Sequence, residues 1–143
     1  EAFGSETEGV LRYPSPEIIA NLDVSTLRDM QFSTRKAEYM IGLSQSIADG
    51  SLELEKFRQM EDDEVTEKLT AYRGVGPWTA QGFLMSGLGR PNLFPIADIG
   101  LQNALKTLWK LEKKPTKEEI IARFPHWTPY LSYAALYLWR SIE

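Results

Sequence analysis

Apolar residues recur at helical spacing along most of the chain, and helix start and stop signals separate the segments. Ser15-Pro16 predicts the start of a short helix, because serine caps helices and proline fits the first turn. Ser33 or Thr34 predicts the start of a longer helix that Gly50 ends. Pro115-Thr116 predicts a further short helix over Lys117–Arg123. The acidic segment Glu1–Gly9 is expected to be a loop or frayed. The pattern therefore predicts an all-α fold.

The last helix is expected to begin at about Thr128. It is apolar nearly all round, which is typical of a buried helix. Most of its aromatic residues are expected in the core: Tyr130, Tyr133, Tyr137 and Trp139. His126, the only histidine, is expected in a loop before this helix, as a surface or capping residue rather than a catalyst.

Two glycines separated by one residue divide another pair of helical patterns. Glu64–Tyr72 and Trp78–Leu88 are both predicted helices, and Pro77 fits the first turn of the second. The pattern predicts a helix–hairpin–helix over residues 61–88. A tight glycine turn leaves backbone N–H groups free to bind an anion such as phosphate. An αα-hairpin without a ligand explains the same pattern.

Four acidic residues, Glu61 to Glu64, open the first helix of this hairpin. A metal site is one interpretation of such a cluster. The favoured interpretation is that negative charge is matched to the helix dipole. No metal ligand is assigned.

A loop rich in glycine and proline is predicted over residues 86–100. Asp98 lies near its end, just before an amphipathic helix that begins around Leu101, so local rules predict a helix N-cap. The helix dipole and backbone donors would also keep this carboxylate ionised. A fixed carboxylate can stabilise positive charge on a sugar or accept a proton from water. The capping and chemical roles are compatible.

Length and composition limit the class of protein. A chain of 143 residues suits one domain, and the absence of cysteine excludes disulfides, thiol chemistry and cysteine-held iron–sulfur clusters. No apolar run approaches the roughly 20 residues of a membrane-spanning helix, and no signal peptide is seen. An intracellular protein is expected.

The charge is unevenly distributed along the chain. The net charge is −4, with −8 in residues 1–70 and +4 in residues 71–143. The hairpin turn thus lies in the basic half, which permits a local basic face. A lysine cluster in this half is interpreted as a solvated face, with phosphate contact as the alternative: Lys106, Lys110, Lys113, Lys114 and Lys117.

Three blocks carry a resemblance to a known family. Arg73-Gly-Val-Gly-Pro-Trp-Thr-Ala80 and Phe94-Pro-Ile-Ala-Asp98-Ile-Gly-Leu101 resemble the hairpin and catalytic loop of the helix-hairpin-helix DNA glycosylase superfamily. The block from Phe124 to Trp139 is similar to the closing helix of its 3-methyladenine DNA glycosylase II, or alkylbase DNA glycosylase, branch. The resemblance covers about Tyr13 to Arg140. It implies a single glycosylase domain over residues 1–143, a partial one that lacks its N-terminal helices and the loop that wedges the duplex open.

The resemblance also implies roles for individual residues. Asp98 would be catalytic, Trp78 and Trp139 would line the base pocket, and a third group would contact the DNA backbone: Arg73, Gly74, Val75, Gly76 and Thr79. Trp78 stands where lyase-type members have a nucleophilic lysine, so base release without strand cleavage is expected. An alkylated purine is positively charged, and an indole face attracts a cation. Core packing is the alternative role for each tryptophan.

The implied function is a monofunctional glycosylase that flips alkylated purines of the 3-methyladenine type out of the duplex and hydrolyses their N-glycosidic bond. The partner would be damaged double-stranded DNA, the protein is expected to be a monomer, and a missing N-terminal segment of the same protein would complete it. No cofactor is required, although the hairpin carbonyls could hold a monovalent ion.

Some positions differ from the branch. Gly82 stands where some members have tyrosine, Ile99 where some have an aromatic residue, and Leu131 where arginine is common. The preferred base therefore stays open. Three alternatives also remain: a non-catalytic hairpin module that grips phosphate, a structural helical piece that needs a partner, and a glycosylase for another damaged base.

Overall fold

The computed structural model describes residues 3–7 and 9–142. The chain forms two compact units, Glu1–Gly76 and Pro77–Glu143. The boundary between Gly76 and Pro77 falls inside the predicted hairpin. The single domain over residues 1–143 stays a prediction.

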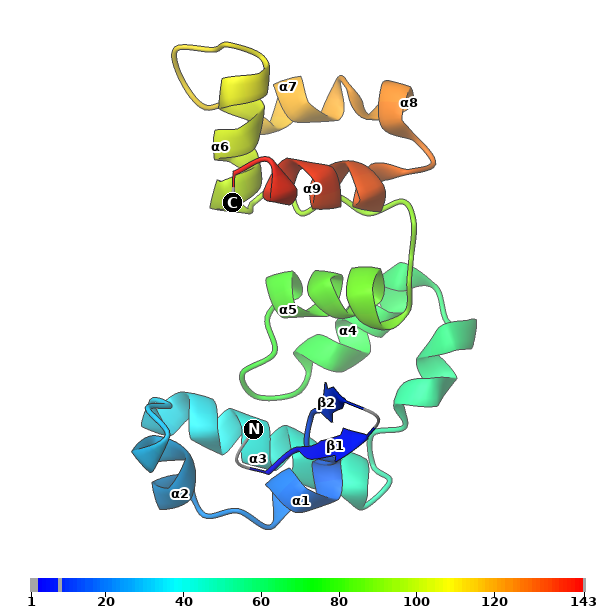
Figure 1. Ribbon diagram of the computed structural model, residues 1–143. Coiled ribbons are helices and arrows are strands. Elements are labelled where there is room, and N and C mark those ends of the chain that lie inside the picture. The colour runs from blue at the N-terminus through cyan, green and yellow to red at the C-terminus, as the bar shows by residue number, and fades with distance from the viewer. Residues whose placement is uncertain (1–2, 8, 143) are drawn as a thin grey trace. The chain divides into compact units, whose positions relative to one another are not determined.

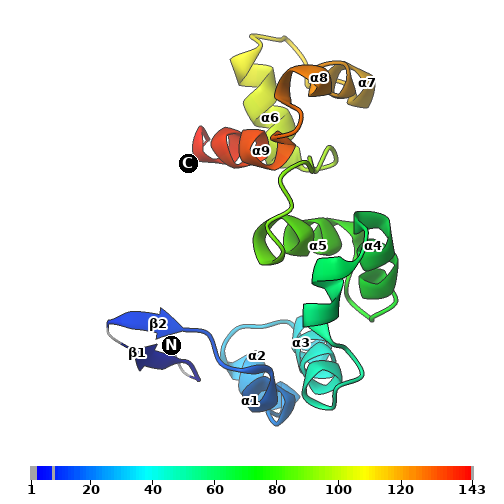
Figure 2. The same cartoon turned by 90° about the vertical axis from the view of Figure 1, so that its right-hand side faces the viewer.

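The first unit is built mainly from short helices, drawn in blue to green in Figure 1. Its elements are β1 (Ser5–Thr7), β2 (Val10–Arg12), α1 (Pro16–Ala20), α2 (Val24–Asp29), α3 (Thr34–Ala48), the 3₁₀ helix η1 (Leu54–Gln59) and α4 (Asp62–Thr70). Ser33 caps α3 as predicted, because its hydroxyl accepts a hydrogen bond of 3.3 Å from the Lys36 N–H. Both α1 and α2 lie against α3, where Leu27, Ala37 and Ile41 form a small core (Figure 2).

The two strands correct the loop expected over Glu1–Gly9. β1 pairs with β2 in an antiparallel ribbon, with Ser5 opposite Arg12. Every residue of both strands is exposed, so the alternation of buried and exposed positions that marks a strand in a sequence is absent. The part of this prediction that concerns residues 1, 2 and 8 lies outside the described residues. The all-α class is confirmed, with this ribbon as a small addition.

The second unit contains five helices and a π-helical turn among its described residues: α5 (Pro77–Gly82), η2 (Phe83–Gly87), α6 (Ile99–Leu108), α7 (Lys117–Ile121), α8 (Phe124–Trp127) and α9 (Leu131–Arg140). The single helix predicted over Trp78–Leu88 therefore changes from α to π winding after Gly82. The Leu88 N–H bonds the Phe83 carbonyl, five residues back, at 3.0 Å. His126 lies in α8 rather than in a loop, and it is exposed as expected.

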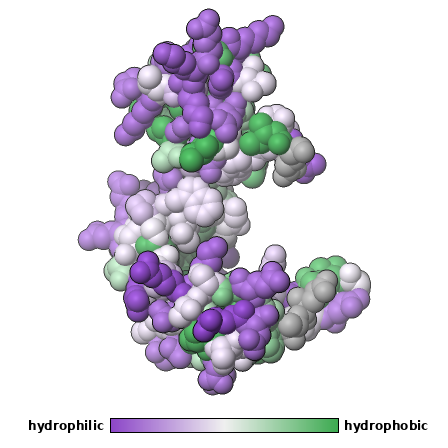
Figure 3. Space-filling model, turned by 90° about the vertical axis from the view of Figure 1, so that its left-hand side faces the viewer, coloured by the Kyte–Doolittle hydropathy of each residue, from purple (hydrophilic) through white to green (hydrophobic). Residues whose placement is uncertain are grey.

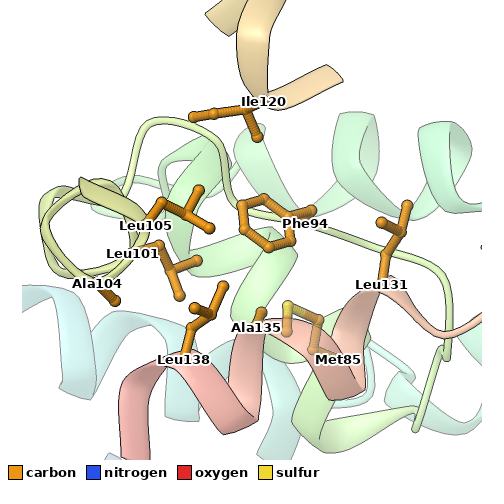
Figure 4. Packing of buried hydrophobic residues seen from close by; sticks show 9 residues of the cluster. All are labelled: Met85, Phe94, Leu101, Ala104, Leu105, Ile120, Leu131, Ala135 and Leu138. Atoms are coloured by element: carbon orange, nitrogen blue, oxygen red, sulfur yellow. The ribbon is translucent and has the colours of Figure 1, made fainter. Parts of the chain in front are cut away.

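The core of the second unit joins α6, α7 and α9 to the loop that precedes α6. Figure 4 shows Phe94 of this loop among the buried side chains of the helices, which are Met85, Leu101, Ala104, Leu105, Ile120, Leu131, Ala135 and Leu138. The Phe94 ring lies 5.6 Å from the Phe124 ring and 5.8 Å from the Trp127 ring, between ring centroids. Burial of Phe94 anchors the loop four residues before Asp98.

Helix α9 is buried on one side only, which corrects the fully buried helix predicted from its apolar sequence. Leu131, Ala135 and Leu138 face the core, whereas Tyr133 is 52% exposed and Tyr137 is 78% exposed. Tyr130, just before the helix, is exposed as well.

On the face drawn in Figure 3, hydrophilic residues predominate and hydrophobic ones form small separate patches. Among the helices of the described residues, none has the length and apolar character needed to cross a membrane.

A capping box fixes the start of α7, and its loss is a measurable prediction. The Thr116 hydroxyl accepts from the Glu119 N–H at 3.2 Å, and the Glu119 carboxylate accepts from the Thr116 N–H at 2.7 Å. Thr116→Ala should lower the free energy of unfolding by about 1 kcal/mol. Urea denaturation followed by circular dichroism measures it. Thr107→Ala is the control, because that hydroxyl bonds only the carbonyl four residues back; equal losses in both variants would contradict the capping role.

Candidate active site

Asp98 caps α6, as the sequence predicts. Its backbone is extended (φ −69°, ψ 121°), and its Oδ1 accepts a hydrogen bond of 2.9 Å from the Leu101 N–H. A backbone bond of 2.9 Å from the Asp98 N–H to the Pro95 carbonyl turns the chain into the helix. The carboxylate is thus fixed at the positive end of the helix dipole.

Two indole groups hold the same carboxylate. Trp78 of α5 donates from Nε1 to Oδ2 of Asp98 at 3.2 Å, and Trp139 of α9 donates from Nε1 to Oδ1 at 3.2 Å. The two tryptophans are 20 and 41 residues from Asp98 in the sequence. The second unit therefore brings together the residue predicted to be catalytic and both residues predicted to line the base pocket.

The hydrogen bonds decide the charge state of Asp98. Burial by itself raises the pKa of the carboxyl. The N–H groups of Leu101, Trp139, Trp78 and Gly100 outweigh burial and hold the pKa below its ordinary value. Asp98 is consequently an anion at neutral pH, and a weak base.

A cavity of about 420 Å³ opens beside Trp78 in the second unit. Its lining consists of Pro77, Trp78, Gln81, Phe94, Ile96, Ala97, Gln102 and Lys117. The volume lies in the range of pockets for small ligands. Because Trp78 is 64% exposed, its indole remains accessible while its N–H edge binds Asp98.

Two further residues shape the site, and sequence reasoning gave neither of them a role. A Cβ added at Gly100 would lie 3.1 Å from Oδ1 of Asp98 and 3.7 Å from Cδ1 of Trp139, so glycine leaves room for both side chains. Ser132 of α9 is buried; its hydroxyl donates to the Arg90 carbonyl at 2.6 Å and accepts from the Leu93 N–H at 3.0 Å. It ties the loop that precedes α6 to α9. The only sequence signal was a serine within an apolar helix.

The glycine turn belongs to the first unit. Gly74 has a φ of +89°, and the Val75 N–H bonds the Tyr72 carbonyl at 3.1 Å. Within the described residues, the N–H groups of Gly74 and Gly76 have no hydrogen-bond partner. The predicted anion-binding donors are therefore these two N–H groups, and the Val75 N–H is already used inside the turn.

The other residues predicted to contact the DNA backbone are exposed. Arg73 lies 3.6 Å from Glu38 in an ion pair, and its guanidinium stands 5.4 Å from the centroid of the Tyr39 ring. Thr79 lies in α5 of the second unit and is also exposed. The acidic cluster that raised the metal alternative occupies the first turn of α4, with Glu61 as N-cap, as the helix-dipole interpretation requires. In the described part of the chain, no three His, Cys, Asp or Glu side chains gather as metal ligands would.

Comparison with known proteins identifies the family of this chain. Residues 1–129 match the family described as "HhH-GPD superfamily base excision DNA repair protein". The chain belongs to the HhH-GPD superfamily. The superfamily predicted from the hairpin and the Asp98 loop is thereby confirmed.

Relatives within the HhH-GPD superfamily have names that fit the predicted branch. The chain is 58% identical over 142 residues to the "Putative DNA-3-methyladenine glycosylase YfjP" of Bacillus subtilis, covering 99% of this chain and 50% of that protein. It is 40% identical over 146 residues to a second Bacillus subtilis protein, "DNA-3-methyladenine glycosylase", covering 99% of this chain and 48% of that protein. The resemblance to the alkylbase branch is confirmed. The chain spans about half the length of these relatives.

A solved HhH-GPD structure shares the fold. The 3-methyladenine DNA glycosylase Mag1 of Schizosaccharomyces pombe, in complex with abasic DNA, matches with a TM-score of 0.80 and 29% sequence identity. The match covers 94% of this chain and 65% of Mag1. The helix-hairpin-helix glycosylase fold expected from the sequence is thus found in the structure.

Proposed function

We propose that this chain carries the catalytic site of a monofunctional DNA glycosylase that removes alkylated purines of the 3-methyladenine type in base excision repair. The single observation that carries the proposal is the Asp98 carboxylate, held ionised between two indole N–H groups at a helix N-terminus. Relatives with the name DNA-3-methyladenine glycosylase support the choice of substrate class. Its place of action is the cell interior, where the genome lies.

The chemistry follows from the charges on substrate and site. Alkylation of a ring nitrogen makes the purine a cation, which weakens the glycosidic bond and makes the base a good leaving group. As that bond breaks, positive charge develops on the sugar. A fixed anion such as Asp98 stabilises that charge, and a site arranged in advance does so without reorganisation. Because the pKa of Asp98 is low, electrostatic stabilisation is favoured over proton abstraction from water.

The base would be recognised by its own charge. A cationic purine is attracted to an indole face, and Trp78 presents an accessible indole beside a cavity of about 420 Å³. Damaged pairing makes such a base easier to flip out of the duplex. In this proposal Trp78 and Trp139 form the base pocket. Trp78 lines the cavity, whereas Trp139 lies outside its lining and is joined to the site by its bond to Asp98.

The glycine turn supplies the proposed contact with the DNA backbone. The unpartnered N–H groups of Gly74 and Gly76 suit a phosphate oxygen, and exposed Arg73 adds a positive charge in the same unit. Thr79 of the second unit is also exposed and offers a hydroxyl. These donors do not distinguish one base from another, so they would position any duplex. Recognition of damage falls to the pocket.

The proposal is tested by base release from methylated duplex DNA, with hot alkali to reveal abasic sites and borohydride to trap any covalent intermediate. We expect alkali-labile sites and no trapped adduct, because Trp78 occupies the position of the lyase nucleophile and cannot form a Schiff base. Unmodified duplex and duplex containing uracil or 8-oxoguanine are the substrate controls. A trapped adduct would overturn the monofunctional assignment, and preferential release of a control base would overturn the substrate class.

A further inference from the structure

The oxygens of Asp98 are occupied unequally. Oδ1 accepts from the Leu101 N–H at 2.9 Å and from Trp139 Nε1 at 3.2 Å, whereas Oδ2 accepts from Trp78 Nε1 at 3.2 Å. A carboxylate oxygen offers about two lone-pair sites. The Gly100 N–H, which also lowers the pKa of Asp98, belongs to a residue on the Oδ1 side, since a Cβ there would lie 3.1 Å from Oδ1. Oδ1 is therefore fully occupied, and Oδ2 keeps one site open.

The bonds from Leu101, Trp139 and Trp78 reach both oxygens and so also fix the plane of the carboxylate. Indole Nε1 is a donor only, so neither tryptophan can reverse the polarity of its bond. A helix N-cap with only the Leu101 bond could still turn about its terminal torsion, which is broad for aspartate. The bond from Trp78 to the second oxygen opposes that rotation.

We infer that Trp78 and Trp139 are positioning residues that hold the Asp98 carboxylate through their N–H edges, so that Oδ2 presents its open lone pair to the reacting sugar. This inference rests on the proposed function for the reaction that Oδ2 serves. It adds a second role to the two tryptophans, because the N–H edge holds Asp98 while the ring face is the part that attracts a cationic base.

Hydrogen bonds rather than neighbouring charges keep Asp98 ionised. The residues of α5 include no ionisable side chain, α6 contributes Lys106, and α9 contributes Tyr133, Tyr137 and Arg140. Lys117 lines the cavity beside Trp78. None of these groups is a cause of the lowered pKa of Asp98, which comes from four N–H donors acting against burial. Removing one indole N–H should therefore raise the pKa.

The first test needs no enzymatic activity. The chain has four tryptophans, so ¹⁵N-labelled protein gives four indole signals. In the Asp98→Asn variant the Nε1–H signals of Trp78 and Trp139 should move, and both should follow one common ionisation when the parent is titrated with acid. Trp109 and Trp127 are internal controls, since they stack on each other with ring centroids 6.1 Å apart. If the signals of Trp78 and Trp139 do not change in the Asp98→Asn variant or with the ionisation of Asp98, the inference is overturned.

The second test separates the N–H edge from the ring face. Benzothienylalanine in place of Trp78 or Trp139 keeps the shape of the ring and removes the donor. We expect single-turnover base release to fall about tenfold at neutral pH, the size of one hydrogen bond to a charged group. In a plot of release rate against pH, the fall in rate at low pH (the acid limb) should move to higher pH. A carboxylate with fewer hydrogen-bond donors has a higher pKa.

Two matched substitutions serve as controls. Fluorinated tryptophan keeps the N–H and weakens the ring face, so it should lower release without moving the acid limb to higher pH. Benzothienylalanine at Trp109 should change neither quantity. An unmoved acid limb in the Trp78 and Trp139 variants would overturn the positioning role. Failure of the parent chain to release any base would instead count against the proposed function, and the indole signals would still decide the positioning role.

Discussion

Asp98→Asn should lower base release from methylated duplex DNA by about 10²- to 10³-fold, the effect of removing one group that stabilises transition-state charge. The substitution removes the negative charge and keeps the shape of the side chain. Asparagine is also as good an N-cap as aspartate, so α6 should form normally. The amide nitrogen cannot accept a hydrogen bond, so one of the present donors loses its partner.

DNA binding provides the contrast that identifies a catalytic role. Affinity for methylated duplex should stay within about twofold of the parent or rise slightly, because a negative charge near phosphates has been removed. Asp23→Asn is the matched control: Asp23 is the N-cap of α2 in the first unit, and the charge change is identical. Release and affinity are measured on the same samples. A variant that retains release, or that loses release and binding equally, would contradict the catalytic assignment.

Local rules were sufficient to predict Asp98, because a helix cap depends on residues close together in the sequence. The carboxylate, the following amphipathic pattern and the loop before it all lie within about fifteen residues, and the cap bond spans three. The starts of α1, α3 and α7 at Ser15, Ser33 and Thr116 were predicted for the same reason. Each was confirmed by the structure.

The arrangement around Asp98 could not be predicted in this way. The resemblance placed Trp78 and Trp139 in the site, but a sequence does not say which edge of a ring faces a partner 20 or 41 residues away. For Trp139, that orientation comes from the packing of α9 against α6. Gly100 shows the same limit, since its importance depends on Oδ1 lying 3.1 Å from the place of the missing Cβ.

Helix α9 shows where an apolar pattern misleads. A hydrophobic residue on every side predicts burial on every side. Only the side that meets the core of the second unit is buried in the structure, and Tyr133 and Tyr137 remain exposed. Hydrophobicity indicates which faces of a helix a neighbouring element could cover, whereas tertiary packing determines which faces are covered.

Gly74→Ala should lower the free energy of unfolding by about 1–3 kcal/mol and weaken DNA binding, because this position requires glycine for two reasons. Its φ of +89° is unfavourable for any residue with a Cβ. The added Cβ would also overlap Cγ and Cδ2 of the Tyr39 ring. Either the turn or the ring must move to relieve that overlap. If the turn moves, the N–H groups of Gly74 and Gly76, which we propose bind phosphate, move with it. Urea denaturation and a binding titration on duplex DNA measure the two effects.

The steric and backbone contributions can be separated by variants of the same unit. Gly50 has a φ of +79° but no atom within 4 Å of an added Cβ, so Gly50→Ala should carry only the backbone strain, about 1 kcal/mol. Combining Gly74→Ala with Tyr39→Ala should lower the cost of the glycine change, because the overlapping ring is gone. The cost should stay above the Gly50→Ala value, because the Tyr39 Cβ remains 2.7 Å from the added Cβ. If Gly74→Ala costs no more than Gly50→Ala in the parent, contact with Tyr39 does not hold the turn. If binding is unchanged while stability falls, the turn does not grip the DNA backbone.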